Sequence, residues 1–189
     1  EKSPNISATF AQDATDAKDL FIVNNWGPDA IDLEAVSADS NPLSITGVNN
    51  PRTFTVEEIR AMPQTEFTAF QNCATNGEGG ALMENIPMKG VPLSYLVEQC
   101  GGLVEGTNAM NASGNDGWAA FPPMDMALDL MYEDCYVVTQ YYGQNLTVDQ
   151  GAPLVLVPCG MPGAQWVKHL GTIDFKVADQ FMDCLLYTS

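Results

Sequence analysis

Apolar and polar residues alternate, or apolar residues cluster briefly, in several short stretches of the chain. Such stretches, bounded by Gly, Pro, Asn and Ser, are typical of β-strands. The stretch at residues 135–142 is rich in β-branched and aromatic residues, which favour strands. The predicted strands are residues 43–46, 66–72, 135–142, 153–157 and 172–177.

Helical signals are fewer and shorter. Residues 55–58, Thr-Val-Glu-Glu, have the pattern of a capping box, so a helix should follow and end at Pro63. A second helix should start at residues 91–93, Val-Pro-Leu, and end at Gly101-Gly102. Met, Ala and Leu recur in residues 124–131 at a spacing that predicts helical structure.

The remaining segments carry little apolar pattern. Residues 1–19 are expected to be a flexible lead, 27–41 acidic and irregular, and 108–119 a loop rich in Gly and Asn. Strands and short helices are intermixed and no internal repeat is present. The sequence therefore predicts one α+β domain with a mixed β-sheet over residues 20–178, followed by a C-terminal tail at 179–189.

The charge balance narrows the classes of partner. The chain has 24 acidic and 7 basic residues, a net charge of −17. Nucleic acid and anionic membrane surfaces need Lys and Arg, so neither is an expected partner. The excess of acidic residues keeps protein molecules apart and so favours solubility. Adaptation to salt or to a crowded surface is the alternative explanation. No apolar run approaches the ~20 residues of a membrane span, so no membrane insertion is expected.

Cysteine usage bears on the compartment. There is no Cys-x-x-Cys pair, so structural zinc is not expected, and an odd count leaves at least one thiol unpaired. The cysteines would form one or two disulfides in an exported protein and be buried thiols in a cytosolic one. Three Asn-x-Ser/Thr sites and a start at Glu1, as in a mature or trimmed chain, favour export to a periplasmic, cell-surface or extracellular space. The cysteines are Cys73, Cys100, Cys135, Cys159 and Cys184, and the Asn-x-Ser/Thr sites are Asn5, Asn111 and Asn145.

An ordered set of landmarks spans most of the chain. Residues 151–158, Gly-Ala-Pro-Leu-Val-Leu-Val-Pro, are followed by 163–171, which hold Lys168 and the single histidine, His169. Upstream come a strand and glycine, a short helix ending in proline, a cysteine at a strand end, and Gly-Val-Pro-Leu at 90–93. In this order the landmarks resemble the sulfite-oxidase-type molybdopterin-binding domain.

That resemblance implies a molybdenum–molybdopterin cofactor and a set of site residues. Cys73 matches the cysteine that ligates molybdenum, a role suited to a soft thiolate. Asn24 and Asn25 match the start of the pterin pocket, and Gly163, Ala164 and Lys168 match the cofactor loop. From the residues alone, Cys73 could equally be a buried thiol or half of a disulfide, and Lys168 a solvated loop lysine.

Several positions depart from the family's pattern. Arg52 and Arg60, the two arginines, match no family site position, although arginine forks normally bind phosphate and sulfite. Trp118 stands where relatives have a tyrosine, and His169, in place of an aromatic residue, is expected to be a structural hydrogen-bonder. Sulfite oxidation itself is therefore not expected.

Two functions remain open. The first is an oxidoreductase domain that moves an oxygen atom or two electrons at molybdenum, working with a redox partner. The alternative is a cofactor-free binding or structural module on the same fold, which would meet another surface protein. Cys73, Asn24-Asn25, Trp118 and the 163–168 loop should converge on one cleft, and Cys73 should pair with Cys159 only in the cofactor-free case.

Overall fold

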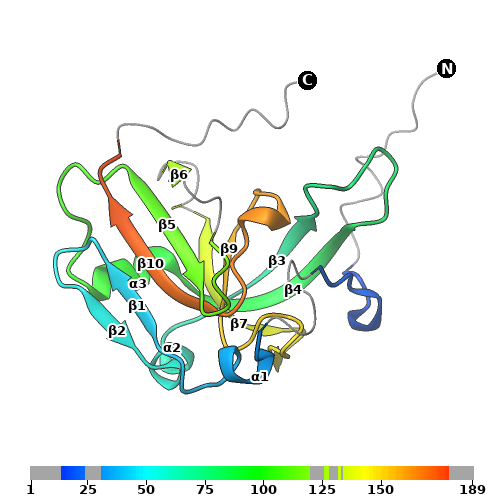
Figure 1. Ribbon diagram of the computed structural model, residues 1–189, viewed down its shortest axis with the longest axis horizontal. Coiled ribbons are helices and arrows are strands. Elements are labelled where there is room, and N and C mark those ends of the chain that lie inside the picture. Colours follow the sequence, from blue (N-terminus) through cyan, green and yellow to red (C-terminus); the bar gives the residue numbers. More distant parts are fainter. Residues whose placement is uncertain (1–13, 24–30, 120–125, 128–131, 133, 179–189) are drawn as a thin grey trace.

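The computed structural model describes residues 14–23, 31–119, 126–127, 132 and 134–178. Within these residues two β-sheets form the body of the domain, with short helices packed against them (Figure 1). The elements are the 3-10 helix η2 (Ala17–Asp19), α1 (Leu33–Val36), β1 (Leu43–Thr46), β2 (Arg52–Phe54), α2 (Val56–Ala61), β3 (Thr65–Asn72), β4 (Met83–Pro92), α3 (Leu93–Gln99), β5 (Ala109–Gly114), β6 (Met126–Ala127), β7 (Cys135–Tyr141), β8 (Gln144–Asn145), β9 (Val155–Pro158), the 3-10 helix η4 (Gly163–Gln165) and β10 (Leu170–Lys176).

The first sheet is mixed. Its strands lie in the order β2-β1-β10-β5-β6, and β1 runs parallel to β10 while the other pairs are antiparallel. Thr46 Oγ1 donates to Asp174 Oδ1 across the parallel pair at 2.6 Å. Chain segments more than a hundred residues apart thus meet in one sheet, which makes the domain a single folding unit.

The second sheet is antiparallel throughout. Its order is β3-β4-β7-β8, and β9 pairs with β7. The strands predicted at 66–72, 135–142 and 153–157 all lie here, whereas the one predicted at 172–177 is β10 of the first sheet. The predicted α+β fold class is confirmed. The expectation that these three strands lie in a mixed sheet was wrong, because the parallel pair β1–β10 belongs to the first sheet and the second sheet is antiparallel.

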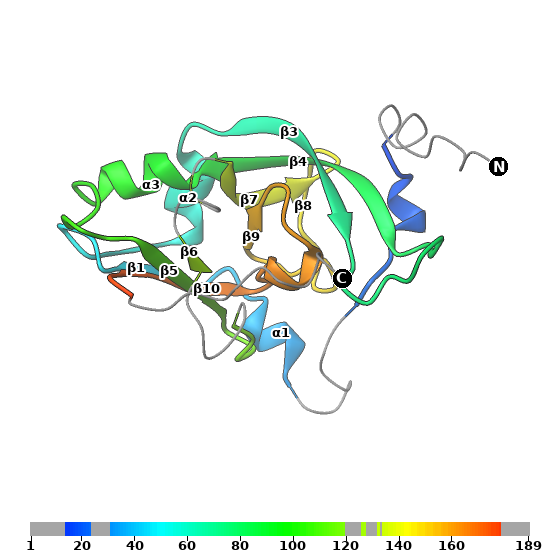
Figure 2. The same ribbon diagram turned by 90° about the horizontal axis from the view of Figure 1, so that it is seen from above.

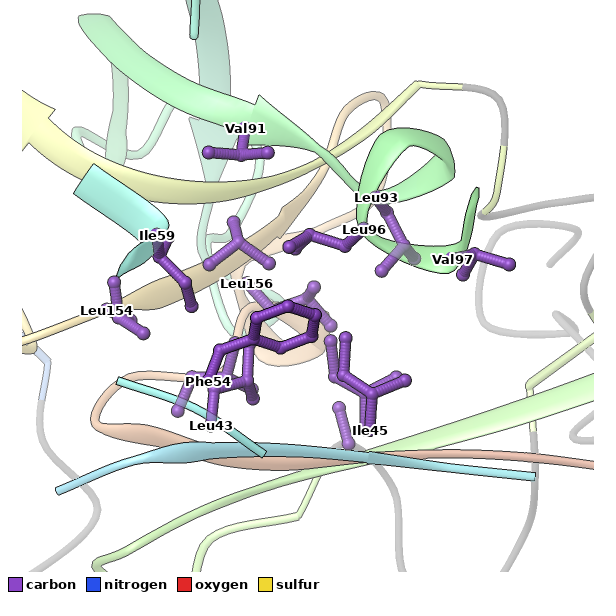
Figure 3. Close-up of a cluster of buried hydrophobic side chains, with 14 of the residues drawn as sticks. Leu43, Ile45, Phe54, Ile59, Val91, Leu93, Leu96, Val97, Leu154 and Leu156 are labelled. Carbon is purple, nitrogen blue, oxygen red and sulfur yellow. The ribbon is translucent and has the colours of Figure 1, made fainter. Parts of the chain in front are cut away.

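The larger hydrophobic cluster lies between the first sheet, α2, α3 and the inner strands of the second sheet (Figure 3). Each large side chain removed from water here contributes roughly 1.5–3 kcal/mol. The cluster therefore joins the two sheets. Its labelled members in Figure 3 are Leu43, Ile45, Phe54, Ile59, Val91, Leu93, Leu96, Val97, Leu154 and Leu156.

A second cluster lies under β3, β4, β7 and β9, with Ile86, Val155 and Trp166 among its members. Phe67 stacks on Tyr136 with ring centroids 4.2 Å apart. Figure 2 shows η2 beside the end of β4 that lies away from α3. This end of the molecule holds the cavity described below.

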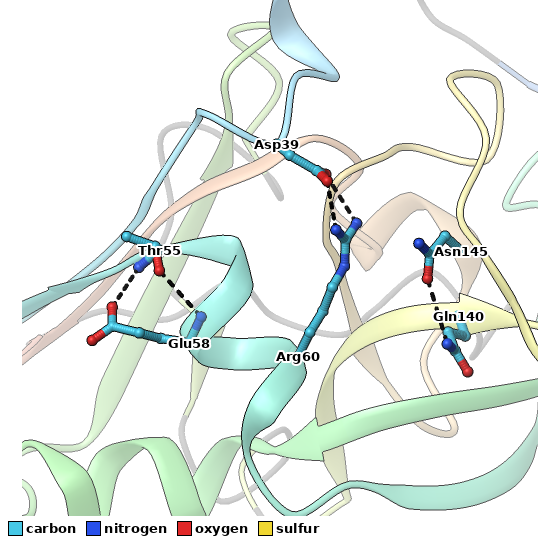
Figure 4. Close-up of polar contacts among 6 residues, drawn as sticks. All are labelled: Asp39, Thr55, Glu58, Arg60, Gln140 and Asn145. Atoms are coloured by element: carbon cyan, nitrogen blue, oxygen red, sulfur yellow. Dashed lines mark hydrogen bonds and ion pairs between the residues drawn. The ribbon is translucent and has the colours of Figure 1, made fainter.

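Both helices predicted at 55–63 and 91–102 are present, and α3 begins at Leu93, directly after β4. Thr55 Oγ1 accepts from the Glu58 N–H at 3.1 Å, and Glu58 Oε2 accepts from the Thr55 N–H at 2.8 Å (Figure 4). The helix α2 ends before Pro63, and Gly101, with φ +77°, follows α3. The hydrogen bond from the Thr55 N–H is the main reason why the pKa of the Glu58 carboxyl lies below its usual value.

Three segment predictions were wrong in part. Residues 108–119 contain the strand β5, because buried Met110 and Ala112 pack into the larger cluster and β10 supplies its hydrogen bonds. Met126–Ala127 is a strand paired with β5, and the rest of the predicted 124–131 helix lies outside the described residues. The segment 27–41 contains α1, which Asp32 caps by accepting from the Ala35 N–H.

Candidate functional site

A cavity of about 840 Å³ lies between the second sheet and the loops before β10. It is lined by segments far apart in the sequence. They include the end of β3 with residues 73–75, part of β4, residues 17–23, the 147–150 loop and the 163–169 loop. A concave site of this size is typical of a ligand site.

Cys73 directly follows β3 and is half-buried in the cavity wall. Its N–H donates to the Leu82 carbonyl at 3.0 Å, and its carbonyl accepts from the Asn76 N–H at 2.9 Å. The sulfur lies 3.2 Å from Thr75 Oγ1. The main chain thus fixes the position from which the thiol reaches the cavity.

The small-residue loop closes against the same strand end. Gly163 and Ala164 open η4 and line the cavity. A Cβ added to Gly163 would lie 3.1 Å from Gln71 Nε2 and 3.4 Å from the Asn72 carbonyl oxygen. The missing side chain at 163 therefore lets the loop pack beside the residues that precede Cys73.

Lys168 is half-buried in the wall and is not a solvated loop lysine. Its Nζ donates to the Asp149 carbonyl at 2.6 Å. Burial lowers the pKa of Lys168, while the carboxyls of Asp149, Asp116 and Glu84 act in the opposite direction. The ammonium group is thus partly desolvated and lies in the field of three acidic side chains.

Glu84, on β4, is 4% exposed and lines the same cavity. Its Oε2 accepts from the Phe21 N–H at 2.9 Å. Burial raises the pKa of this carboxyl to about 7, against the lowering effects of the Phe21 N–H and of Lys168. Sequence reasoning missed Glu84, although the alternation along β4 with buried Ile86 and Met88 places it on the inward face.

His169 is buried and ties together three segments. Its Nδ1 lies 2.7 Å from the Ala152 carbonyl oxygen and 3.2 Å from Ser37 Oγ. Because a carbonyl can only accept, Nδ1 carries the proton. The Asn115 N–H donates to the His169 carbonyl, so the expected structural hydrogen-bonding role is confirmed.

The structure brings six of the residues singled out from the sequence to this cavity, while Asn24 and Asn25 lie outside the described residues. The two arginines lie elsewhere. Arg60 pairs with Asp39 at 2.5 Å (Figure 4). Arg52 pairs with Glu58 at 3.0 Å. The six residues in the cavity are Cys73, Trp118, Gly163, Ala164, Lys168 and His169.

Among the described cysteines every thiol is free, so Cys73 and Cys159 are not bonded, and Cys184 lies outside the described residues. No group of three or more His, Cys, Asp or Glu side chains able to hold a metal occurs in the described part of the chain. In the same part of the chain no helix is long and apolar enough to cross a membrane.

Comparisons with known proteins agree on one family. The family described as the oxidoreductase molybdopterin binding domain matches residues 30–181. The chain is 26% identical over 180 residues to nitrate reductase [NADH] 2 of Phaseolus vulgaris. This alignment covers 82% of the present chain and 20% of the nitrate reductase. It is 30% identical over 157 residues to a nitrate reductase [NADH] of Brassica napus, covering 69% and 17% of the two.

A solved structure is also similar. The sulfane dehydrogenase SoxCD from Paracoccus pantotrophus matches with a TM-score of 0.66 and 26% sequence identity. The match covers 74% of this chain and 39% of that chain. The chain spans about a fifth of the length of the curated relatives it matches, so it is comparable to one domain of those proteins.

Proposed function

The chain belongs to the oxidoreductase molybdopterin binding domain family, and we propose that it binds a molybdenum–molybdopterin cofactor in the cavity beside Cys73. In this proposal the Cys73 thiolate ligates the metal, and Gly163, Ala164 and Lys168 contact the pterin. The observation that carries the proposal is the convergence of Cys73 and the 163–168 loop on one cavity.

The cavity suits the cofactor in size and in the chemistry of its thiol. Its volume of about 840 Å³ lies in the ~300–1,000 Å³ range of small-molecule and cofactor sites. Cys73 offers a soft sulfur ligand from a position that its main-chain hydrogen bonds fix. The packing of Gly163 on Gln71 and Asn72 keeps the loop next to that sulfur.

When bound, the cofactor supplies two-electron redox chemistry and oxygen-atom transfer. The chain's own residues hold, orient and shield it. Lys168 brings a positive charge to the cavity, His169 fixes the loop that carries it, and Trp118 and Trp166 supply apolar wall that excludes water.

Electron exchange would need a second component. The matched proteins are named as a nitrate reductase acting with NADH and as a sulfane dehydrogenase, and each is much longer than this chain. We infer that this domain exchanges electrons with another domain or with a separate redox protein. Its net charge of −17 favours a partner with a basic surface.

Serine substitution at Cys73 tests the assignment of the metal ligand. The Cys73→Ser variant and a matched Cys159→Ser variant are produced in a host that makes the cofactor. Because Cys159 does not line the cavity, its variant should keep wild-type molybdenum, while Cys73→Ser should lose one sulfur neighbour of the metal in X-ray absorption spectra.

Equal sulfur coordination in the two variants would contradict the assignment. A metal-free wild type with Cys73 bonded to Cys159 would instead favour the cofactor-free module. Those two thiols are free in this structure.

Export remains a separate proposal. The acceptor site at Asn145 lies on an exposed strand, where a glycan could be attached. Fractionation of producing cells tests the proposal, and recovery of the protein in the cytosol alone would contradict it.

A further inference from the structure

Basic side chains are scarce, and most lie beside a carboxylate. Of the seven basic residues, Lys2 lies outside the described residues and Lys168 lies in the cavity wall. The other five each form an ion pair within the chain. These pairs are Lys18–Asp16, Arg52–Glu58, Arg60–Asp39, Lys89–Glu66 and Lys176–Asp174.

Among the described residues, two basic side chains line the cavity, half-buried Lys168 and exposed Lys18, so an oxyanion in the cavity would meet both. It would also meet three acidic side chains, Glu84, Asp116 and Asp149. If all three stayed ionised, they would repel the anion and cancel the field of Lys168. An anion site here needs a way to remove negative charge.

Glu84 differs from the other two acidic residues in its surroundings. Asp149 is exposed, and Asp116 is half-buried and accepts a hydrogen bond from the Trp118 N–H. Glu84 is 4% exposed, and it accepts from the Phe21 N–H at 2.9 Å. Its carboxyl is thus the buried acid of the cavity wall, in the field of Lys168.

We propose that the cavity contains a proton-coupled oxyanion site, in which Glu84 takes up one proton from solvent when an oxyanion binds beside Lys168. The proton adds to a carboxylate oxygen of Glu84, and no other bond forms or breaks. The inference deepens the proposed cofactor function of the same cavity. The ligand is either the phosphate group of a cofactor or a free oxyanion substrate.

The surroundings of Glu84 favour this coupling. Burial already raises its pKa to about 7, so little free energy is needed to protonate it at neutral pH. The Phe21 N–H and Lys168 lower the pKa of Glu84. Burial and, after it, the charge of the Glu84 carboxylate raise the pKa of Tyr141 and Tyr142. A bound anion would offset the attraction of Lys168 and add its own repulsion, and both effects favour the neutral carboxyl.

Sulfate binding to the cofactor-free protein tests the site. Sulfate keeps its charge between pH 6 and pH 8, so any pH dependence comes from the protein. With a Glu84 pKa of about 7, linkage predicts about tenfold weaker sulfate binding at pH 8 than at pH 6, at constant ionic strength. Calorimetry in two buffers at pH 8 should show the uptake of about one proton per sulfate.

Three substitutions separate the contributions. Glu84→Gln should bind sulfate equally at both pH values. Asp149→Asn, the matched control, should bind sulfate more tightly at both pH values and keep the tenfold ratio between them. Lys168→Gln should abolish saturable binding. Melting curves show which variants are folded. If Glu84→Gln is poorly folded, the ratio of sulfate affinities at pH 6 and pH 8 in Asp149→Asn still tests the proposal.

The proposal is overturned by the absence of saturable sulfate binding at pH 6, or by a tenfold ratio that persists in folded Glu84→Gln. In protein loaded with cofactor, loss of sulfate binding identifies the cofactor's phosphate as the occupant, and retained binding identifies a free oxyanion. Intact, Glu84-dependent binding in protein that never takes up molybdenum would support this site while contradicting the cofactor proposal.

Discussion

At the scale of single residues, Gly151 gives Lys168 its place in the cavity wall. Gly151 has φ +99°, and a Cβ there would lie 2.6 Å from both Cβ and Cγ of Lys168. The lysine stem thus occupies the space that a side chain at 151 would fill. The charge that faces Glu84 depends on this close approach.

The Gly151→Ala substitution should therefore lower the free energy of unfolding by more than backbone strain alone would. Gly143 is the matched control, because it has φ +72° and a Cβ added there would meet nothing within 4 Å. We expect Gly143→Ala to lower the free energy of unfolding by about 1 kcal/mol, from strain alone. Gly151→Ala should lose about 1–3 kcal/mol more because of overpacking. Urea denaturation measures both, and equal losses would show that Lys168 moves aside freely.

The two residues that define the cavity's charge differ in how far sequence predicts them. Lys168 follows a Gly-Ala loop in the family's order, so its position could be predicted from the resemblance. Glu84 lies in a segment without a strong motif, and its burial depends on β3, β7 and Phe21, which are distant in sequence. Perturbed carboxyls of this kind follow from tertiary packing and not from local pattern.

At the scale of elements, the capping box of α2 is a complete local device. The Thr55 hydroxyl and the Glu58 carboxylate each satisfy one main-chain N–H at the helix start. The helix has six residues and relies on Val56 and Ile59 for packing in the larger cluster. Its first turn therefore depends strongly on the cap.

Thr55→Ala should lower the free energy of unfolding by about 1 kcal/mol, because the Glu58 N–H loses its acceptor. Glu57→Ala removes an exposed carboxylate from the same turn and leaves the box intact, so it should change stability by less than about 0.5 kcal/mol. Thermal melts of the two variants provide the comparison. A Thr55→Ala melt no lower than that of Glu57→Ala would show that the box does not stabilise α2.

Several elements with strong local signals were predicted, whereas α1, β4 and β5 were not. The capping box and Pro63 bound α2, and β-branched and aromatic residues mark β7. In β5, Asn and Gly lower the strand propensity, and the strand forms because β10 and β6 pair with it on either side. Non-local pairing of this kind leaves no trace in a short sequence window.

At the scale of the whole molecule, the order of segments assembles the cavity. The end of β3 brings Cys73, β4 brings Glu84, and the two loops between β8 and β10 bring Asp149 and Lys168. The antiparallel second sheet holds the first two, and Leu170, packed in the larger cluster, anchors the loop that carries Lys168. The proposed metal ligand, Cys73, and the charged residues Glu84 and Lys168 therefore line the same cavity.

The central claim is that this chain holds a molybdenum cofactor beside Cys73. The most direct test is the molybdenum and pterin content of the folded protein, purified from cells in which another molybdenum enzyme is shown to be loaded. About one molybdenum and one pterin per chain are expected, because one cavity and one thiolate, Cys73, are assigned to the cofactor. Folded protein with neither, from cells whose other enzyme is fully loaded, would contradict it.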